Sequence, residues 1–182
     1  MTVWNQDLVL AAWNFASRAH NGQTMPGTEI AYINHVGTVS MEVMAAITED
    51  PACTDKPDLA VLCALLHDTL EDTDTSFETV AEGFGLEVAQ GVKALSKDKT
   101  LGSKQEQMAD SLARIRQQPE EVWMVKLADR ITNLQPPPAH WDREKITAYR
   151  QEAEMILETL GAANATLAER LRLKIENYLR YS

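Results

Sequence analysis

The sequence predicts an all-α protein that folds as one domain over residues 1–182. Along most of the chain, apolar residues recur at the three- and four-residue spacing of amphipathic helices, and no segment alternates like a half-buried strand. The run from Leu59 to Leu66 is apolar at every position, which is typical of a helix buried on all sides. We therefore expect this run at the centre of the domain, since 182 residues can surround it with a sizeable core.

Composition and charge exclude several classes of protein. Apolar residues make up 45% of the chain and charged residues 24%, with a net charge of -10. This balance is globular but disfavours binding to nucleic acid or to an anionic membrane. The N-terminal segment Met1–Asp7 lacks the pattern of a signal peptide, and Cys53 and Cys63 form no disulfide framework. We expect a cytoplasmic protein, and the sequence makes no prediction of its oligomeric state.

The first half of the chain is expected to hold two amphipathic helices before the apolar run. One face of the first helix carries Trp4, Leu8, Ala11, Phe15 and Ala19. This helix ends with His20 at Asn21-Gly22, and an ordered loop follows to Ile33. The inward face of the second helix, which His35 opens, carries Val36, Val39, Val43 and Ala46.

Shorter helices are expected after the apolar run. Thr75 and Glu78 have the spacing of a capping box, so a helix should begin there and break at 83–85. Leu86–Leu95 is predicted to be a short helix and Ser96–Ser103 a surface loop. Gln105–Gln118 is predicted to be amphipathic, with Met108, Leu112 and Ile115 on its apolar face.

The last third of the chain is expected to form three longer helices. One runs from about Glu120 to Leu134, between a favourable proline at its start and three prolines after its end. The next begins at Asp142, and Asn164–Tyr181 forms the last. The inward faces of these last two helices carry Ile146, Tyr149, Ala153, Ile156 and Leu160, and then Leu167, Leu171, Ile175 and Tyr178.

Four ionisable residues follow directly on the apolar run: His67, Asp68, Glu71 and Asp72. Charged groups at the end of a buried helix are costly unless something compensates them. In a continuous helix His67 would lie one turn from Glu71, and Asp68 one turn from Asp72. Either these groups simply emerge into solvent, or they form a cluster that binds a divalent metal and activates water.

Polar residues also stand where apolar ones are expected elsewhere in the chain. Asp129 shares a helix face with Val122, Val125, Lys126 and Asn133. It either pairs internally, with Arg130 as a candidate partner, or binds a ligand.

With His35, His67 and Asp68, Asp129 would complete a nitrogen–oxygen donor set suited to Mn, Fe or Zn. Such a set leaves room for a water and a phosphate oxygen, and Glu71 and Asp72 could accept the proton of that water. The remaining histidines, His20 and His140, are interpreted as structural.

The motifs around these residues resemble the HD superfamily of metal-dependent phosphohydrolases, and in particular the alarmone hydrolases of the RelA/SpoT type and their small free-standing relatives. The segments that carry the resemblance are Ala19–Gln23, Tyr32–His35, Leu65–Thr73, Phe84-Gly85 and Val125–Leu134. The resemblance implies an HD-domain helical bundle that acts on a small-molecule nucleotide. The implied reaction removes the 3′-pyrophosphate of guanosine tetra- or pentaphosphate.

The resemblance also implies roles for individual residues. His35, His67, Asp68 and Asp129 would be ligands of Mn(II). Glu71 and Asp72 would position and activate the attacking water. Lys99, Asn133 and Tyr149 would lie near the nucleotide.

The chain departs from the family pattern where the base should be recognised. The family usually has an Arg-Lys pair after the glutamine that corresponds to Gln23, but in this chain residues 24–26 are Thr-Met-Pro. At position 135 this chain has glutamine where the family often has arginine. Ala31 and Val36 stand where the family usually has prolines. An adenine alarmone, another pyrophosphorylated nucleotide and a generic HD-type nucleotide phosphohydrolase reaction therefore remain alternatives, as does a helical module that only binds a nucleotide or a partner protein.

Overall fold

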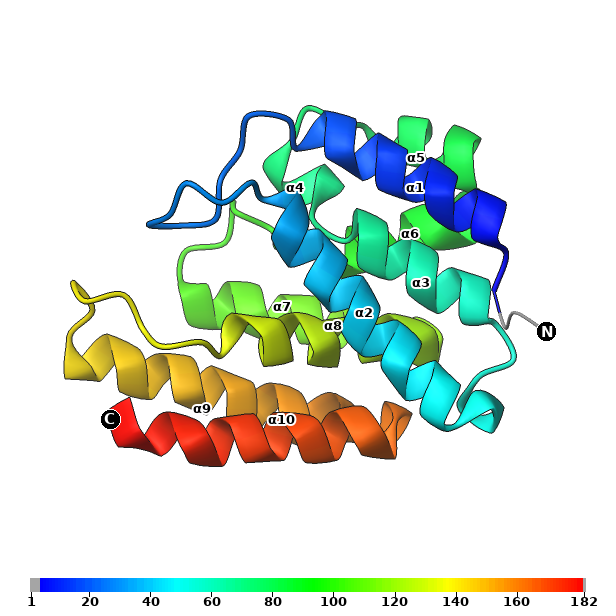
Figure 1. The fold of residues 1–182 in the computed structure, drawn as a ribbon. Helices are drawn as coiled ribbons and strands as arrows, with labels where there is room; N and C mark the ends of the chain where they lie inside the picture. Colours follow the sequence, from blue (N-terminus) through cyan, green and yellow to red (C-terminus); the bar gives the residue numbers. More distant parts are fainter. Residues whose placement is uncertain (1–3, 182) are drawn as a thin grey trace.

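Residues 4–181 are described by a computed structural model, and within them the fold is all-α, as predicted (Figure 1). Residues 1–3 and 182 lie outside this description. The description therefore leaves out the first three residues of Met1–Asp7, the segment that lacks a signal-peptide pattern. The helices are α1 (Gln6–Ala19), α2 (Ile33–Glu49), α3 (Pro57–Leu66), α4 (Thr69–Asp72), α5 (Phe77–Phe84), α6 (Leu86–Leu95), α7 (Lys104–Ile115), α8 (Glu120–Asn133), α9 (Arg143–Leu160) and α10 (Ala165–Tyr178). Short 3-10 turns follow α2, α9 and α10 at Pro51–Cys53, Gly161–Ala163 and Leu179–Tyr181. No helix among residues 4–181 is long and apolar enough to cross a bilayer.

Helix α3 forms the centre of the core, as its sequence predicts. All residues from Leu59 to Leu66 are buried, and none exposes more than 5% of its surface. The helix packs against α1, α2, α6 and α8, so that no side of it faces solvent. Helices α9 and α10 lie side by side and pack on α8 (Figure 1). The predicted inward faces of α2, α7 and α10 are also buried.

The predicted inward face of α1 is wrong by about one residue position. Leu8 is 38% exposed, whereas Ala12 and Ala16 are completely buried. Helix α1 packs on α3, and two alanines one turn apart let the two backbones approach closely. Phe15 is only partly buried, and it packs edge-to-face with Phe84, with 5.4 Å between the ring centres.

The capping box predicted at the start of α5 is not formed. Ser76 is the N-cap, and its side chain accepts the backbone N–H of Thr79, so the helix begins one residue later than predicted. A complete capping box stands instead at the start of α7, where Ser103 and Glu106 exchange side-chain and backbone hydrogen bonds.

Gly91 provides the closest approach between α6 and the centre of the core. A Cβ atom at this position would lie 2.7 Å from Cys63 Sγ in α3 and 2.9 Å from Val122 Cγ2 in α8. We expect Gly91→Ala to lower the free energy of unfolding by about 1–3 kcal/mol, because overpacking a filled core forces its neighbours apart. Chemical denaturation monitored by circular dichroism measures this change.

Gly83→Ala in α5 is the matched control, since a Cβ there would meet nothing within 4 Å. It should leave stability equal or raise it by roughly 0.5–1 kcal/mol. Equal stability of the two variants would contradict the close packing of α6 on α3 and α8.

Candidate metal centre and active site

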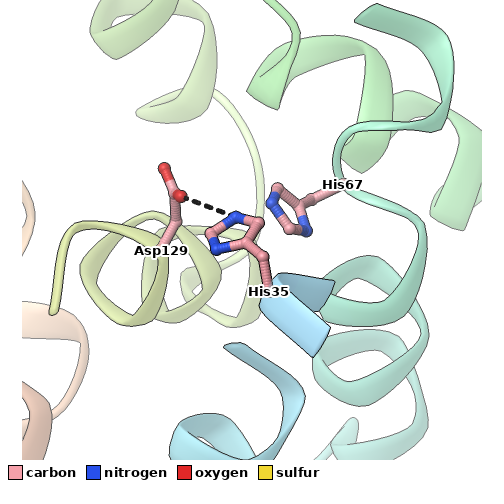
Figure 2. Close-up of side chains that lie close together, drawn as sticks. All are labelled: His35, His67 and Asp129. Carbon is pink, nitrogen blue, oxygen red and sulfur yellow. Dashed lines mark ion pairs between the residues drawn. The ribbon is translucent and has the colours of Figure 1, made fainter. Parts of the chain in front are cut away.

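Two helices and one turn bring the predicted metal ligands together. His35 lies in the first turn of α2, His67 and Asp68 form the turn between α3 and α4, and Asp129 lies in the last half of α8. One donor atom each of His35, His67 and Asp129 lies within 4.8 Å of the other two (Figure 2). Helices that pack on α3 thus converge on its C-terminal end.

Asp68 lies beside the two histidines of this group. Its Oδ2 lies 2.9 Å from His67 Nε2 and 3.6 Å from His35 Nε2, while Asp129 Oδ1 lies 3.5 Å from His35 Nε2. Two imidazole nitrogens and two carboxylates therefore face one small volume. His35, His67 and Asp129 are close enough for one ion to contact all three, and Asp68 lies beside both histidines.

A backbone hydrogen bond fixes which ring nitrogen of His67 faces the carboxylates. Its Nδ1 lies 2.8 Å from the carbonyl oxygen of Ala64, which can only accept a hydrogen bond, so Nδ1 carries the proton. The buried Nε2 is therefore the ring nitrogen that faces the carboxylates, 2.9 Å from Asp68 Oδ2. Metal-bound histidines commonly have their second nitrogen fixed in this way. The ring nitrogens of His35 and His67, together with the carboxylates beside them, form a nitrogen–oxygen donor set that fits a divalent ion.

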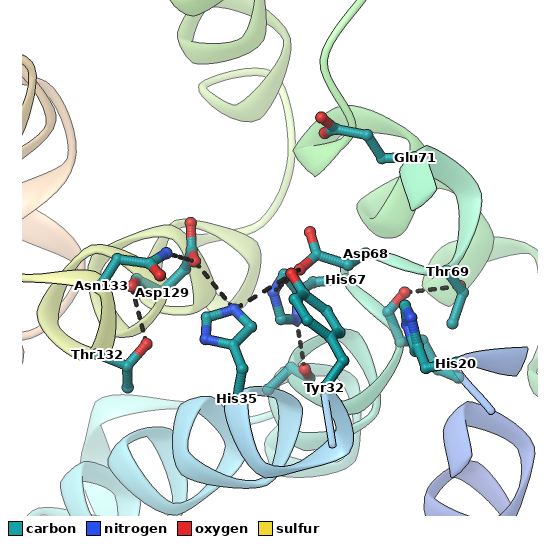
Figure 3. Close-up of polar contacts among 12 residues, drawn as sticks. His20, Tyr32, His35, His67, Asp68, Thr69, Glu71, Asp129, Thr132 and Asn133 are labelled. Carbon is teal, nitrogen blue, oxygen red and sulfur yellow. Dashed lines mark hydrogen bonds and ion pairs between the residues drawn. The ribbon is translucent and has the colours of Figure 1, made fainter. Parts of the chain in front are cut away.

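Neighbouring polar groups orient the two carboxylates. The Tyr32 hydroxyl donates to Asp68 Oδ2 at 2.6 Å, and the Asn133 side-chain amide donates to Asp129 Oδ1 at 2.5 Å (Figure 3). Lys126 Nζ lies 3.2 Å from Asp129 Oδ2. These contacts restrict each carboxylate to one orientation.

Arg130 is not the partner of Asp129, so the hypothesis of an ion pair between these two residues is wrong. Its guanidinium lies 3.1 Å from Glu152 and packs on the Tyr149 ring, 4.3 Å from the ring centre. Because successive residues of a helix point in different directions, Arg130 faces α9 while Asp129 faces the histidines. The internal pairing of Asp129 is with Lys126 instead.

The charges of these groups depend on one another. Burial opposes a charge on His35, but the carboxylates of Asp129 and Asp68 outweigh it and raise the pKa of His35 to about 9. Burial would likewise raise the pKa of Asp129, yet Lys126 and His35 hold it well below its usual range. Both carboxylates are therefore ionised in the neutral pH range, whereas His35 is protonated there and would have to release its proton to bind a metal.

The predicted acidic pair lies beside the candidate ligands. Glu71 and Asp72 line the same cavity as the four residues, with a volume of about 160 Å³. Glu71 Oε2 accepts the backbone N–H of Lys97 at 2.8 Å, and Asp72 Oδ1 lies 3.0 Å from Lys99 Nζ. The continuous helix that the spacing assumed is broken, because His67 and Asp68 form a turn between α3 and α4. The backbone N–H of Asp72 nevertheless donates to the Asp68 carbonyl at 2.9 Å, so one helical turn still separates the acids from the histidine–aspartate pair.

The residues predicted near the nucleotide are placed at different distances from this cavity. Asn133 lines it, and Lys99 lines a neighbouring cavity of about 480 Å³ that shares Glu71 and Asp72 with it. Tyr149 is not among the lining residues of either cavity. Its ring lies between Arg130 and the indole of Trp141, whose centre is 5.1 Å away.

Sequence reasoning gave no role to two residues of this cavity, Tyr32 and Lys97. Tyr32 precedes His35 by one helical turn, which is the only local signal of its contact with the site. Lys97 stands in the polar loop after α6, and its side chain lines the cavity together with Lys126. Burial and the nearby charge of Lys126 lower the pKa of Lys97.

His20 supports the site indirectly. Its Nδ1 lies 2.8 Å from Gln23 Oε1, and Gln23 Nε2 donates to the carbonyl oxygen of Asp72 at 2.6 Å. The His20 ring also packs against Tyr32, with 5.1 Å between ring centres. The buried position and contacts of His20 agree with a structural role, whereas His140 is exposed in the loop before α9.

Comparisons with known proteins agree with this site. The HD domain family model matches residues 12–167. The chain is 33% identical over 177 residues to a human protein named guanosine-3′,5′-bis(diphosphate) 3′-pyrophosphohydrolase MESH1, covering 90% of each chain. It is 34% identical over 170 residues to the protein of the same name from Xenopus tropicalis, again covering 90% of each.

A solved structure has the same fold. It is described as a metazoan ortholog of SpoT that hydrolyses ppGpp, and it superimposes with a TM-score of 0.78 at 29% sequence identity. The match covers 93% of this chain and 94% of the other.

Proposed function

The chain belongs to the HD domain family as a phosphohydrolase homologous to the MESH1 enzymes, and from this we propose that it removes the 3′-pyrophosphate of guanosine tetra- or pentaphosphate. The products would be GDP or GTP and pyrophosphate. We further propose that residues 1–182 form the single domain that does this. The observation that carries the proposal is one cavity that gathers His35, His67, Asp68 and Asp129 with the acidic pair Glu71 and Asp72.

We propose Mn(II) as the ion held by His35, His67, Asp68 and Asp129. Two aspartates balance the charge of a divalent ion, and the mixture of imidazole and carboxylate ligands suits Mn(II) better than a thiol-preferring metal. When bound, such an ion lowers the pKa of water and offsets negative charge that develops on phosphorus.

The acidic pair would take up the proton of the attacking water. Lys97 holds Glu71 through Oε2, and Glu71 Oε1 lies 3.9 Å from Lys99 Nζ, which is too far for a hydrogen bond. Oε1 therefore remains able to accept a proton. Asp72 forms an ion pair with Lys99. The two acids are therefore in different electrostatic environments, although they are adjacent in sequence.

Attraction of a phosphate-rich substrate to a chain of net charge -10 must be local. The sequence offers Arg18, Lys99, Lys126 and Arg130 as cations for this purpose. Arg130 is unsuited, because Glu152 and Tyr149 already occupy its guanidinium. Lys97 is a better candidate, since it is one of the residues that line the cavity itself.

Lys99→Ala is expected to raise the Michaelis constant more than it lowers turnover. Lys99 is 61% exposed beside the acidic pair, so it can contact a phosphate group equally in the ground state and in the transition state. Loss of such uniform binding changes KM rather than kcat. Steady-state kinetics would measure both, with Lys104→Ala, an exposed lysine at the start of α7, as the control. A fall in kcat at unchanged KM would contradict this role.

A nucleotide screen with added Mn(II) tests the proposed function directly. The assay compares guanine and adenine tetraphosphates side by side and separates pyrophosphate from orthophosphate release. We expect pyrophosphate from the guanine compound, with weak discrimination against adenine because Thr24, Met25 and Pro26 replace the Arg-Lys pair. Pyrophosphate from neither compound would reject the proposal. Orthophosphate release from ordinary nucleotides would then favour a generic HD-type phosphohydrolase, which is the second candidate function.

A further inference from the structure

Arg114 in α7 binds the C-terminal end of α6 with its whole guanidinium. Nη1 donates to the carbonyl oxygens of Lys93 at 2.8 Å and Ala94 at 3.0 Å, and Nη2 donates to that of Ser96 at 2.8 Å. Nε lies 2.7 Å from Asp110 Oδ2, which fixes the plane of the group. The last carbonyls of a helix have no partner within it, so Arg114 satisfies them from a neighbouring helix. Its charge also suits the negative end of the helix dipole.

One of these bonds leads directly to the proposed active site. The Ser96 carbonyl and the Lys97 N–H belong to the same planar peptide group. Arg114 donates to the oxygen of this group, and the N–H of the same group donates to Glu71 Oε2 at 2.8 Å. A single rigid peptide therefore connects the guanidinium on α7 to the carboxylate on α4.

We propose that Arg114 is a positioning residue for Glu71 and acts through the Ser96–Lys97 peptide. This inference rests on the proposed function of Glu71 as the group that accepts the proton of the attacking water. Arg114 fixes the orientation of the peptide, and donation to its oxygen polarises the N–H and strengthens the bond to Glu71.

The geometry requires arginine. The guanidinium offers donors in a fixed planar fork, and Arg114 uses them on three carbonyl groups and one carboxylate. A lysine keeps the charge, but its compact ammonium group cannot span these acceptors. Arg114→Lys therefore separates the loss of the fork from the loss of charge.

A double-mutant cycle tests the inference. Arg114→Lys should lower kcat by roughly 10- to 100-fold, as loss of a residue that orients a site residue commonly does, with little change in KM. In a Glu71→Gln background the same change should cost nothing further, because its effect passes through the Glu71 carboxylate. An equal fall in both backgrounds, or none in either, would overturn the proposal. Arg172→Lys, which breaks a similar fork on exposed carboxylates of α10, is the control and should keep wild-type kcat.

Nuclear magnetic resonance provides a readout that needs no turnover. We expect the Lys97 amide proton to move upfield and to exchange faster with solvent in Arg114→Lys, in a protein whose circular-dichroism spectrum is that of the wild type. Arg114→Gln serves as the second variant if the lysine protein unfolds. An unmoved Lys97 amide in a folded variant would refute the link. If the wild type released no pyrophosphate from any nucleotide, the proposed function would fail, while the amide measurement would still decide whether Arg114 positions Glu71.

Discussion

Asp129→Ala is expected to abolish both metal retention and hydrolysis. The substitution removes a carboxylate whose Oδ1 lies 3.5 Å from His35 Nε2, and with it one of the two negative charges of the donor set. It also leaves the ammonium group of Lys126, only 7% exposed, without its partner. An unpaired positive charge in a buried site repels a second cation and destabilises the fold. Metal content measured by mass spectrometry, with kcat on the same sample, checks the prediction.

Two further variants separate ligand loss from charge repulsion. The double variant Asp129→Ala/Lys126→Met lacks the unpaired ammonium group of Lys126. We still expect no bound metal, because the carboxylate of Asp129 is missing. Stoichiometric metal in this double variant would show that Asp129 is not a ligand. Glu158→Ala, an exposed acid of α9, makes the same charge change away from the site and should retain metal and activity.

Glu71→Gln and Asp72→Asn should each lower kcat by roughly 100- to 10,000-fold, the usual cost of removing a positioned acid or base. An amide keeps the shape of the side chain. In Glu71→Gln its oxygen can still accept the Lys97 N–H, so the substitution removes the charge and the ability to accept a proton. Metal content should stay at the wild-type level, because neither residue belongs to the donor set.

The comparison of the two amide variants is informative in itself. Asp72→Asn also loses the ion pair with Lys99, so its KM should change more than that of Glu71→Gln. Near-normal turnover in both variants, with metal still bound, would reject the proposed role of the acidic pair.

The family and the all-α fold were predictable because their signals are local. The apolar run Leu59–Leu66 predicts α3, and the glycine before Leu86 marks the start of α6. Both bounds of α6 agree with the prediction. The HD domain match then confirms the resemblance that the motifs around His67 and Asp129 carry. Helices and motifs of this kind can be predicted from the types of residue and their spacing along the chain.

Contacts between distant segments were not predictable in this way. Periodicity alone could not tell that Ala12 and Ala16, rather than Leu8, would approach α3. Likewise, the spacing within α8 could not show that Arg130 would turn to Glu152 on α9. Tyr32 and Lys97 join the site through contacts with Asp68 and Glu71 that lie 36 and 26 positions away. Only the packed structure shows which residues meet across such separations.

The convergence of α2, α3 and α8 on one group of donors links metal affinity to stability. An ion held by positions 35, 67 and 129 would close two long loops of the chain, and it would bind only when all three helices are packed. A ligand that binds the folded state alone stabilises it by mass action, by about 2.7 kcal/mol at one hundred times its dissociation constant. Metal supply would then set the folded population as well as the number of competent sites. A substitution in the core of α3 would weaken metal binding without touching a ligand.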